Sequence, residues 1–320
     1  MAYEKYSKGL LVSLIVASVA VVLGSCFVGK QSTEVVGMRG FVCPAYLLSS
    51  IALLCFFAAL SLAHYRVVHY LPFREEERLR TSIVALLLVM CLPDAFLGKE
   101  ALFALLPMQI INLYLFADSK PNQEASPYRA TSIGFWCVIA ALIWPPALLL
   151  LPISLINMLA GERSGQLKSM LALFCGVVAT ALCVTPFLVL YPEALLPQLS
   201  YFAEAFVPQP IWLGVHFGLP THCFLIALLL CAVLTLLVRL AYSEPTKVIT
   251  RHQIASQLRY LYLLPFALFY TQHMVGLFLL VLIPLSEVAV FSFRQFGKKL
   301  HLFFFFALLL LAITIQVISR

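Results

Sequence analysis

An all-α bundle of transmembrane helices is the fold that this sequence predicts, and two observations support it. The chain of 320 residues is 62% hydrophobic and only 11% charged, whereas soluble domains carry about 25% charged residues. Its apolar residues gather into about eleven stretches of the kind that cross a bilayer. These stretches cover residues 10–28, 42–63, 81–97, 101–117, 132–145, 146–160, 168–191, 222–241, 260–271, 274–292 and 301–318. Little chain remains outside them, so we expect one integral membrane domain, residues 1–320.

The basic residues are distributed unevenly between the two sides of the predicted bundle. All of the 21 Lys and Arg residues lie on the side of the N-terminus, except Lys30, Arg39, Lys99 and Arg320. Short loops that carry positive charge are retained in the cytoplasm. We therefore expect a protein of the bacterial inner membrane, with its N-terminus in the cytoplasm and its C-terminus outside. Anionic lipid headgroups, not nucleic acid, are the expected partners of these basic loops.

Three pairs of neighbouring stretches are short and turn at the external side. The turns lie near Pro93-Asp94, Trp144-Pro145-Pro146 and Thr271-Gln272-His273. Proline cannot donate a backbone hydrogen bond, and it disfavours helix at the residue before it. Such short, interrupted pairs line binding cavities in some membrane proteins. They also arise where helices bend around a packed centre, and the sequence leaves both interpretations open.

Few residues of this chain are suited to chemistry. Ionisable groups at membrane depth are costly and often functional, and Asp94 and Glu287 are of this kind. Glu287 would carry protons, bind an amine or satisfy a neighbouring helix. On the external face, Glu34 of the first loop is the candidate catalytic residue. The candidate binding residues are Arg39, Asp94, His216, His273 and Glu287.

Recognisable sites for metals and cofactors are missing from the sequence. None of the nine cysteines forms a Cys-x-x-Cys pair, and the phosphate-binding loop, dinucleotide and zinc-helix motifs are absent as well. We therefore predict no metal site and assign no cofactor. Cys26 and Cys43 flank the first external loop and could approach each other in an oxidising compartment, and the sequence leaves open whether they pair.

Residues 135–152 carry a resemblance to a known family. They read FWCVIAALIWPPALLLLP, which resembles a family of uncharacterised bacterial multi-pass proteins of about this length. The likeness extends to Leu102–Phe116 and Arg163–Tyr191, and some members carry a carotene-oxygenase label. That label implies an iron site with clustered histidines, and the seven histidines here are scattered.

A more distant resemblance concerns the layout of the whole chain. A first external loop followed by short helical hairpins is similar to GT-C-type glycosyltransferases, which use polyprenyl-phosphate sugars on the external face. Such enzymes place acidic residues in that loop, where this chain has Glu34 without an acidic neighbour. The resemblance implies Glu34 as base or metal ligand, with Arg39 or a histidine on the phosphate.

Three functions follow from these observations. The first is a GT-C-like protein that binds a lipid-linked sugar. The second is a non-catalytic membrane subunit or scaffold that packs against protein partners in a cell-envelope assembly. The third is a transporter that uses Glu287 and Asp94. The sequence alone does not choose between enzyme and scaffold.

Overall fold

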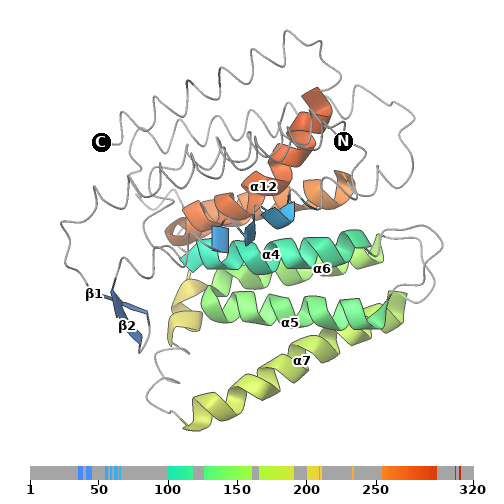
Figure 1. Ribbon diagram of the computed structural model, residues 1–320. Coiled ribbons are helices and arrows are strands. Elements are labelled where there is room, and N and C mark those ends of the chain that lie inside the picture. Colours follow the sequence, from blue (N-terminus) through green and yellow to red (C-terminus); the bar gives the residue numbers. More distant parts are fainter. Residues whose placement is uncertain are drawn as a thin grey trace, which may run out of the picture.

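Helices make up nearly all of the part of the chain that the structure describes. This computed structural model describes residues 35–38, 41–44, most of 55–65, 100–117, 126–160, 166–190, 200–208, 254–293 and the single positions 210, 233, 307 and 310. Within these ranges the fold is helical apart from one short β-hairpin (Figure 1). The predicted stretches 10–28 and 81–97, with nearly all of 222–241 and 301–318, lie outside the described residues.

The hairpin is formed by β1 (Val35–Met38) and β2 (Phe41–Pro44), which pair antiparallel with Val35 opposite Pro44. Valine and phenylalanine, which begin these strands, favour extended backbone. The first three residues of the predicted stretch 42–63 are therefore part of a strand. Helical residues are found between 55 and 65. Cys43 lies in β2, whereas Cys26, the other cysteine that flanks this loop, lies outside the described residues.

The middle of the chain forms four helices close to the predicted positions. These are α4 (Glu100–Ala117), α5 (Pro127–Ile143), α6 (Leu150–Leu159) and α7 (Gln166–Leu190). α5 begins five residues before the predicted 132, with Pro127 in its first turn, where a missing N–H costs nothing. It ends at Ile143, and the backbone of the next residue, Trp144, is extended (φ −143°, ψ 102°) because Pro145 follows. A 3-10 turn, η1 (Pro145–Leu149), then leads into α6.

The C-terminal part repeats this pattern of a helix, a break and a second helix. Residues 254–258 are helical and continue into η3 (Arg259–Tyr262) and α11 (Leu263–Phe269). The chain leaves helical geometry at Tyr270 (φ −117°, ψ 67°), passes through η4 (Thr271–His273) and enters α12 (Met274–Phe293). The predicted stretches 260–271 and 274–292 are thus two helices and not one.

The helices pack in an order that can be followed in Figure 1. α5 lies between α4 and α7, and α12 lies on the other side of α4. Leu105, Met108 and Ile111 recur every three residues along α4, and all three are fully buried. This spacing places them on one face of the helix, so α4 supplies the centre of the hydrophobic core.

α12 is the most enclosed helix of the described part. Every residue from Gly276 to Val288 is buried, including Ser286 and Glu287. A helix that is apolar all round belongs inside a bundle. Pro284 lies within α12, and Figure 1 shows the helix bent in its middle, as expected where a proline removes a backbone hydrogen bond.

α5 and α7 cross at two glycines. A methyl group at Gly134 would overlap the carbonyl oxygen of Leu173, and one at Gly176 would overlap the carbonyl oxygen of Thr131. The two backbones therefore touch directly. Close approach through small residues is a common way for helices to associate in membranes, where burial of apolar surface gives little driving force.

α7 contains the one described segment, Gln166–Pro186, that is long and apolar enough to cross a membrane. Its buried residues form a narrow stripe that includes Ser169, Leu173, Gly176 and Thr180. Most of the other residues whose exposure the structure describes are exposed or partly exposed, and Leu171, Val178 and Leu182 are each more than half exposed. Monomeric soluble proteins rarely expose so continuous an apolar face, so the helix fits a lipid environment.

Candidate functional site

The predicted site residues are only partly within the described structure. Glu34, Arg39, Asp94 and His216 lie outside the described residues. His273 lies in η4 and is partly buried, whereas Glu287 lies in α12 and is 1% exposed. Fourteen residues separate these two, which corresponds to about 20 Å of helix. The structure therefore does not bring His273 and Glu287 into one site.

Two helical hairpins with a break at the turn lie side by side. The first is α5, η1 and α6, the second is α11, η4 and α12, and their turns lie at the same end. At that end, the rings of Trp144 and His273 meet edge to face, with centroids 5.9 Å apart. Further along, the Tyr262 hydroxyl donates a hydrogen bond to the carbonyl oxygen of Leu149. At the opposite end, the Arg259 guanidinium donates to Oδ1 of Asn157 on α6. The hairpins are thus joined along their full length.

A third segment covers the joined turns. Residues 200–206, which include a short helix, are held there by Gln272. Its Nε2 atom donates to the carbonyl oxygens of Glu204, at 3.2 Å, and Ala205, at 3.3 Å. The ring of Phe206 meets that of Tyr270 edge to face at 6.4 Å. The sequence predicts that all three segments lie on the external side of the bundle, and the structure brings them into contact.

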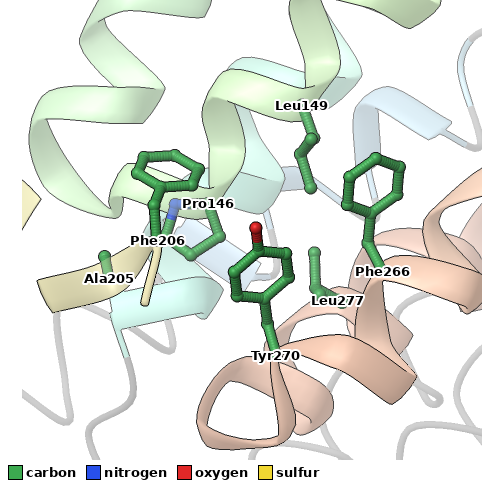
Figure 2. Close-up of a pocket in the computed structure, with 7 residues that line it drawn as sticks. All are labelled: Pro146, Leu149, Ala205, Phe206, Phe266, Tyr270 and Leu277. Carbon is green, nitrogen blue, oxygen red and sulfur yellow. The ribbon is translucent and has the colours of Figure 1, made fainter. Parts of the chain in front are cut away.

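A small cavity, the turn pocket, lies where these segments meet. Its lining residues are Pro146, Leu149, Ala205, Phe206, Phe266, Tyr270 and Leu277 (Figure 2). Its volume is about 40 Å³, and one water needs roughly 10–15 Å³ of such space. As it stands, the pocket has room for a few methyl-sized groups.

Tyr270 occupies the centre of the turn pocket. Its ring stacks on that of Phe266, with centroids 6.4 Å apart and planes 7° from parallel. In Figure 2 its hydroxyl points between Pro146 and Leu149, and no described residue forms a hydrogen bond with it. The pocket therefore offers an apolar, aromatic wall with one free hydroxyl, and its described lining contains no charged side chain.

The sequence indicated some of these residues and missed others. The breaks at Trp144 and at Thr271–His273, and the aromatic segment around Phe206, were all predicted to lie on the external side. Tyr270 was not singled out, because a tyrosine at the end of an apolar stretch is typical of a membrane interface. Its place beside the break was the signal that could have identified it.

Loss of the Gln272 amide is expected to loosen residues 200–206. Gln272→Leu removes two hydrogen bonds, each worth about 0.5–1.5 kcal/mol. Backbone amides of residues 200–206 should then exchange with deuterium faster than in the wild-type protein. Gln166→Leu is the matched control, because Gln166 also donates to a backbone carbonyl, that of Leu159, at a distant place. Equal exchange in all three proteins would show that Gln272 does not hold this segment.

Acidification is expected to lower the stability of the folded protein, because His273 is partly buried at the joined turns. Burial lowers the pKa of His273 below the ordinary value, and the backbone of Ala205 offsets only part of this shift. The unfolded chain then binds a proton more readily than the folded protein, so stability is complete above about pH 6.5 and falls as pH decreases below it. Melting temperatures measured from neutral pH to about pH 5 should fall more steeply for the wild type than for His273→Gln. If the melting temperatures of both proteins fall equally with pH, protonation of His273 is not the cause of the loss of stability.

Comparison with known proteins does not assign this chain to a family. The chain matches no family model, no curated protein and no solved structure.

Proposed function

We propose that this chain is an integral protein of the bacterial inner membrane that binds a lipid-linked substrate, a polyprenyl phosphate, on the external face. The membrane location is supported by the exposed apolar face of α7 and by the composition of the chain. The orientation is supported by the basic residues, which favour a cytoplasmic N-terminus. In this arrangement the turn pocket is at the external end of the two hairpins.

The turn pocket is the observation that carries this proposal. Its aromatic lining and its single hydroxyl suit a slender, unsaturated hydrocarbon chain next to a polar group. Aromatic residues are also enriched at the level of the lipid headgroups, which is where such a chain joins its phosphate. The described lining provides no cation for that phosphate. Arg39 is the proposed partner of the phosphate, and Glu34 is the proposed base or metal ligand of a glycosyl transfer.

Binding can be tested with a photoreactive polyprenyl phosphate and the purified protein in lipid nanodiscs. Tyr270→Ala should reduce capture about tenfold, which corresponds to about 1.4 kcal/mol, because it removes the central wall of the pocket. Phe174→Ala is the control, since Phe174 is an exposed aromatic residue on α7. Equal capture by the wild type and both variants would contradict binding at the turn pocket.

A catalytic role requires a second measurement. If the protein transfers sugar, Glu34→Gln should abolish complementation of a deletion strain while leaving capture of the lipid intact. If it is instead a transporter, Glu287→Gln should be the damaging change. Complementation that survives both substitutions would leave a non-catalytic role.

The alternative function, a non-catalytic subunit of an envelope assembly, is favoured by one observation. The interior of the described bundle is occupied by α12, which has no exposed side between Gly276 and Val288. Because side chains of α12 occupy the centre of the described bundle, this centre suits a protein that binds its partners through its outer surface. Co-purification of a stoichiometric partner that is lost when exposed α7 positions such as Leu171 are changed would support this function over lipid binding.

A further inference from the structure

Four buried polar residues lie together between α4 and the segment that leads into α11. We call them the amide layer: Gln109 and Asn112 on α4, with Gln257 and Tyr260 on the other segment. None is more than 2% exposed. The Tyr260 hydroxyl donates a hydrogen bond of 2.5 Å to Oδ1 of Asn112, so the two segments are in direct contact at this point.

The two glutamines lie within one helical turn of that hydrogen bond. Gln109 precedes Asn112 by three residues, and Gln257 precedes Tyr260 by three residues. Residues three apart are neighbours on one face of a helix. Because all four residues are buried, the same faces of the two segments point into the bundle. The amide layer therefore places two buried glutamines beside the Asn112–Tyr260 hydrogen bond, one on each segment, inside an apolar core.

Five side-chain atoms of the amide layer have no hydrogen-bond partner in the part of the chain that the structure describes. They are Nε2 and Oε1 of both glutamines and Nδ2 of Asn112. Buried polar groups in native proteins are almost always paired, and each unpaired one costs a large part of its desolvation energy. Five such atoms in one patch would remove a substantial share of the stability of a protein this size. Some polar occupant must therefore satisfy them.

The chemistry of the five atoms selects the occupant. Three are N–H donors and two are carbonyl acceptors. A metal cation would be repelled by the donors, and an anion would need a positive charge that the layer lacks. Arg259, the neighbour of Tyr260, donates to Asn157 on α6. Water both donates and accepts, and buried waters commonly make about three hydrogen bonds to such groups.

We propose that the amide layer is a binding site for ordered water molecules within the bundle. None of its residues lines the turn pocket, so this hydrated site is separate from the proposed lipid site and does not depend on it. The bound waters would form hydrogen bonds with both α4 and the segment before α11, and these bonds can break and form again as the waters exchange. The direct hydrogen bond from Tyr260 to Asn112 is then accompanied by hydrogen bonds that pass through water.

X-ray radiolysis of the purified protein in nanodiscs tests this proposal, because ordered waters generate hydroxyl radicals where they are bound. Met108 lies four residues before Asn112 on the same face of α4 and is 0% exposed; Met274 is 1% exposed and lies at the start of α12. Oxidation of Met108 should be several-fold faster than that of Met274, although both are buried. Equally slow oxidation of the two methionines would overturn the proposal.

A double variant sharpens the test. Gln109→Leu with Gln257→Leu should reduce Met108 oxidation to the level of Met274, since it removes four of the five atoms that hold the water. Thr185→Val, a change on the exposed face of α7, should leave it unchanged. Undiminished Met108 oxidation in a folded double variant would contradict the site. If the double variant does not fold, the comparison of the two methionines in the wild-type protein still decides.

Discussion

Replacement of Gly176 by leucine is expected to separate α7 from α5 and to prevent recovery of folded protein. Even a methyl group at this position overlaps the carbonyl oxygen of Thr131, and a backbone atom cannot move aside as a side-chain end can. Overpacking of a well-packed site typically costs about 1–3 kcal/mol, and sometimes more. Here we expect a cost above that range, because two backbones must move apart.

The measurement is the yield and melting temperature of a fluorescent fusion after size-exclusion chromatography. Gly134→Leu should have the same effect from the other helix, and Gly176→Ala should be intermediate. Ala179→Leu is the matched control, because Ala179 is exposed on the same helix. If Gly176→Leu and Ala179→Leu behave alike, α7 does not depend on this crossing.

Replacement of Trp144 by alanine is expected to have the second largest effect. The indole is 4% exposed, lies at the break between α5 and η1, and packs against the His273 ring of the other hairpin. Removal of a large buried aromatic side chain typically costs about 3–5 kcal/mol. The variant should lose stability and also the alignment of the two turns, so capture of a lipid at the turn pocket should fall with it.

Trp136→Ala provides the comparison for this variant. Trp136 lies within α5, is partly buried and contacts Phe135 edge to face at 5.3 Å, so its loss should cost less and leave the turns aligned. Thermal unfolding of the two variants, together with deuterium exchange of residues 270–277, separates the effects. A larger loss in Trp136→Ala would contradict the role given to Trp144.

Sequence patterns predicted the helices better than the contacts between them. The break at Trp144 could be predicted because two prolines follow it, and proline acts on its immediate neighbours. The separation of α11 from α12 was likewise signalled by the polar Thr271-Gln272-His273. By contrast, the hairpin at Val35–Pro44 was partly hidden, since the apolar residues of β2 continue into a hydrophobic run.

The candidate sites were largely beyond sequence reasoning. The hydrogen bond between Asn112 and Tyr260 joins residues 148 positions apart, and neither residue type reveals its partner. The crossing of Gly134 and Gly176 is similar, because a glycine in an apolar stretch does not indicate which helix it touches. Local propensity operates over a few residues, whereas these contacts are set by how whole helices pack.

The enclosure of α12 has a consequence for the order in which the protein is assembled. Proteins are synthesised from the N-terminus, so α4, α5, α6 and α7 are made before residues 274–293 leave the ribosome. A helix with no lipid-facing side cannot simply join the outside of a finished bundle. The earlier helices must therefore remain apart, or part again, until α12 arrives between its neighbours. During this interval Oδ1 of Asn112 lacks the hydrogen bond from Tyr260, because Tyr260 has not yet been made.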